Sequence, residues 1–220
     1  MQESSIGRRD FIKAGSAVAL MGAAHLSAPA SLQAWQKKKS RVVLIRDKDV
    51  LDDLNRPHKG VLTGMFEEAD AKLCDAQNAD AAWQYLIKPT DSVGIKTNVW
   101  RFLRTPEILE QHAAKHAMTV GVPEDRIAVD DRGVLTNDGF TKATALINMR
   151  PMRTHHWSGL GTLIKNYIMF IERPAELHGD SCADLASVWK LPHVAGRTRL
   201  NVLVMLTPLF HGSGPLHYDP

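Results

Sequence analysis

The strongest constraint on the fold is the alternation of short apolar runs with amphipathic segments between residues 41 and 206. The runs that predict strands are rich in β-branched residues and cover residues 41–46, 92–96, 126–130, 144–149 and 200–206. The last run, LNVLVML, is interpreted as apolar on both faces, which is typical of a strand covered by helices on both sides. The sequence therefore predicts an α/β protein with a mostly parallel open sheet and helices on both faces.

Helices are predicted between these strands, from apolar positions at helical spacing and from residues that begin or end helices. The predicted helices are residues 60–75, residues 79–87 before Pro89, residues 106–121, a helix from a Ser158 cap to Ile171, and residues 180–189.

The N-terminal segment has the layout of an export signal. Its parts are, in order, Arg8 and Arg9, Lys13, the apolar stretch Ala14–Leu26 and the small-x-small cleavage site Ala28-Pro29-Ala30. The arginine pair resembles the twin-arginine (Tat) signal, so we expect the Tat translocase as an export partner. We predict a signal over residues 1–30, a linker over 31–40 and one α/β domain over 41–220. The mature protein would be periplasmic or extracellular, without a stable membrane span.

Composition restricts the possible partners and cofactors. A net charge of +3 over 220 residues gives no indication of a nucleic-acid partner. The chain has two cysteines, Cys74 and Cys182, whereas a self-contained iron–sulfur cluster needs about four thiolates. After export these cysteines would be in an oxidising compartment. They could form a disulfide with each other or stay as two separate thiols, and the sequence does not decide between these alternatives.

Polar and charged residues follow every predicted strand. They are Asp47, Lys96-Thr97-Asn98, Asp130-Asp131, the segment Arg150–His156 and the segment Thr207–His211. Ligands of open α/β sheets bind beyond the carboxyl ends of the strands. The sequence therefore predicts one ligand-binding crevice there.

Three segments resemble one known family. GIKTN, LINMRPMRTHHWSGLGTLIKN and LNVLVMLTPLFHGSGP, behind a Tat signal, are similar to the domain of unknown function 362 family, over roughly Val42 to the C-terminus. The most specific part is the set Thr154, His155, Gly159, Lys165 and Asn166. The resemblance implies an α/β fold and association with iron–sulfur or redox proteins, without an established activity. Some members carry ferredoxin-type cysteines, and this chain has none.

The resemblance also concerns the end of the chain. In the family, the Gly-Pro segment precedes a further strand and helix that contain an Asp-Pro motif. This sequence stops at Asp219-Pro220. We therefore expect the C-terminal part of the family domain to be missing.

Potential metal ligands are frequent in the second half of the chain: His155, His156, His178, His211, His217, Cys182 and Asp184. Zinc, iron and copper bind imidazole, thiolate and carboxylate. One hypothesis is a transition-metal site formed by His155, His156, His178, His211 and Cys182. The other is a group of hydrogen-bonded histidines without a metal, because no H-E-x-x-H or C-x-x-C spacing brings the ligands together.

An anion site is a second hypothesis. Ser158-Gly159-Leu160-Gly161 would lead into a helix whose N–H groups point at the crevice, although a helix packing closely on the sheet would have the same glycines. The cations that would add charge are Lys96, Arg150, Arg153 and Lys165. The candidate ligand-binding residues are Asn98, Arg153, Gly159, Gly161, Lys165 and Asn166. In an enzyme, His155 or His211 would act as ligand or acid/base, and Lys96 would stabilise negative charge.

Two further patterns are an adjacent pair of carboxylates and a pair of histidines. Asp130-Asp131 would suit a hard metal or acid/base chemistry, but a capping or solvated pair is the preferred interpretation. His112 and His116, four residues apart, would chelate a metal, but an amphipathic helix edge is preferred. We expect an exported protein that binds a metal or a small anion in a redox-associated context, as an enzyme or as a binding module. The alternative is a non-catalytic scaffold or partner of an exported redox complex.

Overall fold

The computed structural model describes residues 40–209 of the chain. The predicted signal with Arg8 and Arg9, the predicted linker up to residue 39, and His211 and His217 lie outside the described residues. Every element described below belongs to the unit that begins at Val42.

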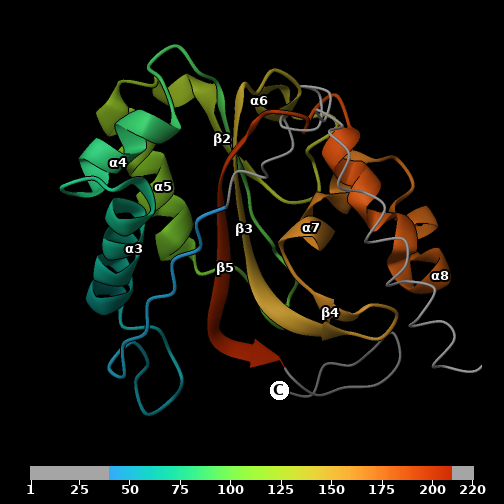
Figure 1. Ribbon diagram of the computed structural model, residues 1–220, viewed down its shortest axis with the longest axis horizontal. Helices are drawn as coiled ribbons and strands as arrows, with labels where there is room; N and C mark the ends of the chain where they lie inside the picture. The colour runs from blue at the N-terminus through green and yellow to red at the C-terminus, as the bar shows by residue number, and fades with distance from the viewer. Residues whose placement is uncertain (1–39, 210–220) are drawn as a thin grey trace, which may run out of the picture. The chain divides into compact units, whose positions relative to one another are not determined.

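A five-stranded sheet organises the described residues (Figure 1). β1 (Val93–Lys96) pairs in parallel with β2 (Ile127–Asp130) and with β3 (Ala145–His155). β5 (Thr198–Leu209) pairs in parallel with β3, and β4 (Gly159–Gly161) pairs antiparallel with the end of β3. The predicted α/β class and the mostly parallel sheet are confirmed.

Three long helices form one layer: α3 (Lys59–Cys74), α4 (Ala79–Leu86) and α5 (Glu107–Val120). Figure 1 shows them together on one side of the sheet. α5 ends at Gly121 because the left-handed φ of 104° at this position suits a residue without a side chain. Ile95 and Ile147 point from the sheet into the hydrophobic cluster that these helices bury.

Shorter helical segments form the second layer. They are α6 (Asp138–Thr141), α7 (Leu163–Asn166), η2 (Tyr167–Phe170), η3 (Pro174–His178), α8 (Gly179–Cys182) and η4 (Ala183–Lys190), with η1 (Glu124–Arg126) before β2. Their buried side chains form a second cluster, to which β3 contributes Leu146. Successive residues of a strand point to opposite faces, so Leu146 and Ile147 belong to different clusters.

The predicted first strand is wrong. Residues 41–46 are in no strand, and the side chains of Val42 and Leu44 are 87% and 54% exposed. β-branched composition indicates only that a segment suits a pleated, half-buried surface, and here no neighbouring strand supplies that surface. The predicted run 200–206 lies within β5, but β5 pairs only with β3 among the described strands. Its faces are partly covered, with Met205 43% exposed.

The predicted helix from Ser158 to Ile171 begins later than predicted, although residues 163–170 are helical through α7 and η2. β3 continues to His155, and a tight hairpin leads into β4, so the chain becomes helical only at Leu163. The predicted helix 180–189 is interrupted, because Asp180, Ser181 and Cys182 have positive φ values of 45°, 55° and 66°. The helices predicted at 60–75, 79–87 and 106–121 are confirmed within a residue or two. Over residues 40–209, no helix has the length and apolar character needed to cross a membrane.

Candidate functional site

Polar side chains are buried together where β1 ends and along β3 from Asn148 to His155. Each is at most 8% exposed, and the group comprises Lys96, Thr97, Asn98, Thr105, Asp131, Asn148, Arg150, His155, Lys165 and Asn166. We call these residues the polar cluster. The predicted crevice residues Lys96, Asn98, His155, Lys165 and Asn166 are all members. Burial of so many polar groups is tolerated only where their hydrogen bonds and charges are compensated.

Lys96 is held by its neighbours. Its Nζ forms an ion pair with Asp131, donates to Thr97 O at 2.8 Å, and lies 3.4 Å from Asn166 Oδ1. Burial lowers the pKa of Lys96 to about 8, although Asp131 acts in the opposite direction. Asp131 also accepts from the Val99 N–H at 2.9 Å. The geometry supports a structural role for this pair, which joins the ends of β1 and β2.

Asn166 joins α7 to the sheet. Its Nδ2 lies 2.9 Å from Asn148 Oδ1, 3.1 Å from Met149 O and 3.2 Å from Lys96 O. Asn148 Nδ2 in turn donates to Leu163 O and to Asn201 Oδ1. Asn148 was missed by the sequence analysis, although a polar residue inside an apolar strand is a usable signal for a buried hydrogen-bond network.

Arg150 is a buried cation that forms no ion pair with a carboxylate of residues 40–209. Arg150 is only 3% exposed, and its Nε has no hydrogen-bond partner. The ion pairs among residues 40–209 do not include it. Burial and the neighbouring Arg153 lower the pKa of Arg150 to about 9, although Asp131 acts in the opposite direction. A Cβ added at Gly161 would lie 3.3 Å from Arg150 Nη2, so the β4 backbone lies against the guanidinium.

Lys165 is the second such cation. It is 4% exposed, and its Nζ contacts His178 Nε2. Burial lowers the pKa of Lys165 to about 8; Cys182 opposes this change and Arg150 adds to it. Both Arg150 and Lys165 therefore remain protonated at neutral pH. No carboxylate within the described part of the chain forms an ion pair with Lys165 either.

Three of the predicted histidines lie next to these cations. The His155 ring lies 5.4 Å from that of His156 and 5.6 Å from that of His178, with Trp157 beside all three. Burial, Lys165 and His178 lower the pKa of His155 to about 3, so the ring is neutral at physiological pH. Because His155 Nδ1 accepts from the Ser158 N–H at 3.3 Å, the proton of the neutral ring is on Nε2. His155 is thus a hydrogen-bond donor in this region.

The structure places the remaining predicted ligands less favourably. Gly159 and Gly161 lie in β4, opposite His155 and Arg153, rather than at a helix N-terminus. The following α7 has four residues, which removes the helix-dipole argument for the anion site. Arg153 is half-buried, with its guanidinium 3.8 Å from the Trp100 ring centroid. Cys182 is buried, and no disulfide joins it to Cys74.

The adjacent carboxylates of Asp130 and Asp131 have different roles. Asp130 accepts from the Gly133 N–H and from Asn137 Nδ2, both at 3.1 Å, as expected of a carboxylate that organises a turn. Burial acts to raise the pKa of Asp130, but these hydrogen bonds outweigh burial and leave it below its usual value. Asp131 is instead the partner of Lys96.

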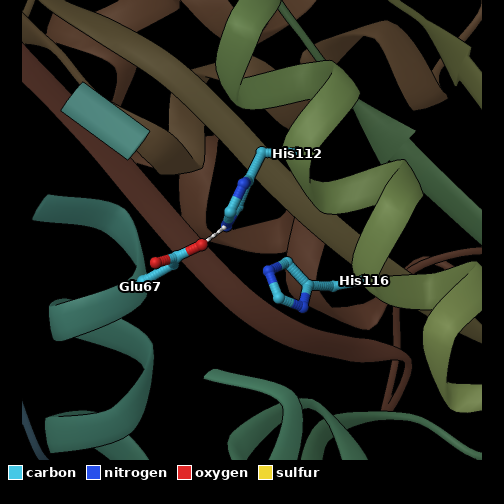
Figure 2. A group of neighbouring side chains, drawn as sticks. All are labelled: Glu67, His112 and His116. Carbon is cyan, nitrogen blue, oxygen red and sulfur yellow. Dashed lines mark ion pairs between the residues drawn. The ribbon is translucent and has the colours of Figure 1, made fainter. Parts of the chain in front are cut away.

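A second group of titratable side chains lies among the long helices (Figure 2). Ligand atoms of Glu67, His112 and His116 all lie within 4.8 Å of one another. His112 and His116 are each only 6% exposed, so they lie within the buried face of α5 rather than at the edge of that face, as an amphipathic helix edge would place them. Burial and the adjacent His116 lower the pKa of His112 to about 4. Glu67 was not predicted, because no sequence spacing relates α3 to α5.

Among residues 40–209, this triad is the group of potential metal ligands whose ligand atoms lie close together. The predicted set His155, His156, His178 and Cys182 does not meet the same proximity. A pocket of about 240 Å³ lies elsewhere at the strand ends, between Thr105, Pro151 and Thr207, and no member of the cationic group Lys96, Arg150 and Lys165 lines it.

Comparison with known proteins gives no match to a family model, to a curated protein or to a solved structure. The resemblance to the domain of unknown function 362 family stays a prediction from the motifs quoted above.

Proposed function

We propose that the protein binds a small anion, a phosphate or a carboxylate, in the polar cluster where β1 ends beside the middle of β3. The observation that carries this proposal is the buried guanidinium of Arg150, whose Nε has no hydrogen-bond partner and which has no carboxylate in an ion pair. Burying an uncompensated charge is costly in free energy. A bound anion would supply the missing charge and the missing acceptor.

The charge balance of the cluster supports an anion rather than a cation. Lys96, Arg150 and Lys165 are all buried, whereas Asp131 is the carboxylate buried with them. Asp131 is already paired with Lys96, so Arg150 and Lys165 remain for the ligand. Guanidinium presents two parallel N–H donors that match phosphate and carboxylate oxygens, and an ammonium adds a point charge. His155 Nε2–H is a third donor in the same region.

Thermal unfolding tests the proposal with inorganic phosphate as the probe. The wild-type melting temperature should rise in phosphate relative to chloride at equal ionic strength, because a ligand that binds only the folded state stabilises it. Arg150→Met and Lys165→Met should lose this rise. Arg173→Met is the matched control, because Arg173 is exposed and paired with Glu176.

The ligand-free proteins give a second readout. Arg150→Met should unfold at a higher temperature than wild type in chloride, because it removes the uncompensated charge while keeping an apolar side chain of similar length. An equal phosphate response in wild type, Arg150→Met and Lys165→Met would contradict the proposal. So would the absence of any response of the wild type to phosphate and to citrate.

We further propose that the protein acts outside the cytoplasm after export by the Tat translocase, which rests on Arg8, Arg9 and the apolar stretch behind them. Replacing both arginines by lysine should leave the precursor in the cytoplasm in a folded form. Unchanged export of this variant would contradict Tat dependence.

A further inference from the structure

The helical layer of α3, α4 and α5 contains two buried histidine nitrogens that form no hydrogen bond, although one of them, His116 Nδ1, faces the Asp80 carboxylate at 2.9 Å. They are His112 Nε2 and His116 Nδ1, on residues that are each 6% exposed. An unsatisfied polar atom in such a position costs about 1–3 kcal/mol in typical proteins, so it calls for a ligand or an unseen partner. The anion proposal does not account for these nitrogens, because they lie in the layer on the other side of β3.

We propose that Glu67, His112 and His116 bind a divalent transition-metal ion, with Zn²⁺ as the expected metal. The two histidines are four residues apart on α5, and their ring centroids are 4.3 Å apart. Glu67 reaches them from α3, with its Oε1 4.0 Å from His112 Nε2 (Figure 2).

The distances are compatible with one coordination sphere after small side-chain movements. Zinc binds imidazole nitrogen and carboxylate oxygen at about 2.0–2.2 Å, so two ligands of a tetrahedral ion lie about 3.3 Å apart. The ligand atoms here are within 4.8 Å of one another. Glu67 can close this difference by rotating its side chain, which is 50% exposed.

Asp80 lies beside the triad and would have to move towards Glu67 and His112 to become a fourth ligand, because the ligand atoms that all lie within 4.8 Å of one another are those of Glu67, His112 and His116. Asp80 Oδ1 lies 2.9 Å from His116 Nδ1, close to the separation expected of two ligands on one ion. Asp80 belongs to α4, so a metal bound by all four side chains would join the three helices. The Asp80 side chain is 59% exposed, so a metal ion could enter from solvent on this side.

The surroundings favour a transition metal over calcium or magnesium. Two of the ligands are imidazoles, whereas calcium and magnesium take oxygen ligands. Aromatic rings enclose the inner side of the triad: Phe66 lies 5.2 Å from the His112 ring, and Trp83 stacks on His116 at 5.6 Å. Such an apolar wall limits water access and strengthens metal–ligand bonds.

The test is a titration of the chelator-treated full chain with Zn²⁺ by calorimetry and with Co²⁺ by visible absorption, which reports tetrahedral coordination. We expect one equivalent to bind in the wild type. Glu67→Gln should weaken binding at least tenfold, and His116→Gln should abolish the cobalt spectrum. Glu68→Gln is the matched control, because Glu68 is the next residue on α3 and pairs with Lys72 at the surface.

Two further variants make the outcome decisive. His155→Ala should bind zinc as wild type does, because His155 belongs to the polar cluster. Glu67→Gln decides the outcome even where His116→Gln fails to fold, since Glu67 is half-exposed. Zinc binding that is unchanged in Glu67→Gln, or lost in His155→Ala, would overturn the proposal. No saturable binding of either metal by the wild type would overturn it as well. The phosphate response is measured separately and should persist in Glu67→Gln, so the two proposals can fail independently.

Discussion

Asp70 provides a quantitative test of the packing between α3 and α4. Its carboxylate is 1% exposed and accepts a hydrogen bond from Trp83 Nε1 at 2.7 Å. Burial raises the pKa of Asp70 from 3.8 to about 7; the Trp83 hydrogen bond acts against this change, and the nearby Glu67 adds to it. The folded protein therefore holds a proton on Asp70 at pH values where the unfolded chain has released it.

The sign and size of the effect on stability follow from this difference. Below pH 3.8 both states are protonated, and above about pH 7 both are ionised. Between these values the folded state binds more protons than the unfolded state, so the free energy of unfolding falls as pH rises. Each pH unit of the window contributes about 1.36 kcal/mol, which gives about 4 kcal/mol across it.

Asp70→Asn removes the titration and keeps an oxygen that accepts from Trp83. We expect the free energy of unfolding of Asp70→Asn, relative to wild type, to increase by about 4 kcal/mol between pH 4 and pH 8. Urea denaturation in the presence of a chelator measures this difference, and any constant cost of the asparagine cancels between the two pH values. Asp125→Asn, at an exposed position, controls for the loss of one carboxylate. A difference between Asp70→Asn and wild type that stays flat over this range would refute the reasoning.

Two further predictions concern the sheet. Lys96→Met should lower the free energy of unfolding by about 3–5 kcal/mol, because it leaves Asp131 buried without its partner. The double variant Lys96→Met/Asp131→Asn should lose less stability than the sum of the two single variants, and additive losses in urea denaturation would contradict the ion pair. Gly94→Ala should cost about 1–3 kcal/mol, because its Cβ would lie 2.9 Å from Leu146 Cδ2 and 3.0 Å from Phe140. Gly64 lies in α3, and a Cβ added there would meet no neighbouring side chain within 4 Å, so Gly64→Ala should instead stabilise the protein by about 0.5–1 kcal/mol. Equal effects of the two alanine substitutions would show that contact with Leu146 and Phe140 does not decide the outcome.

The sequence predicts those elements whose signals are local. α3 and α5 follow from apolar side chains at helical spacing and from the glycine that ends α5. The segment 158–162 could not be predicted in the same way, because Ser158 and two glycines suit a helix cap and a tight hairpin equally well. The extension of β3 to His155 decides between them, and that extension depends on pairing with β4 and β5.

Local patterns can indicate that a single side chain is buried, but they do not identify its partner from a distant segment, and Asp70 was not identified from the sequence. Asp70 lies four residues after Phe66 and eight after Leu62, so helical periodicity places it on the buried side of α3. That signal predicts a buried carboxyl but not Trp83 as its donor. His112 and His116 were identified from their spacing, whereas Glu67 comes from another helix and only tertiary packing brings it to them.

β3 shows why the candidate site lies on one face of the sheet. Ala145, Ile147 and Met149 alternate with Leu146, Asn148 and Arg150, a pattern typical of a strand with one face in solvent. All six are buried, because α7 and the segments after it cover the face that carries the polar side chains.

Burial of that polar face has two different consequences. Asn148 is compensated by the chain itself, since it bonds to Leu163 O, to Asn201 and to Asn166. Arg150, two residues further along the same face, has neither a carboxylate in an ion pair nor a partner for its Nε. On this face of β3, the protein itself supplies the hydrogen-bond partners of Asn148, whereas we propose that a ligand supplies those of Arg150. Substitution of Arg150 is therefore the most direct test of the anion proposal.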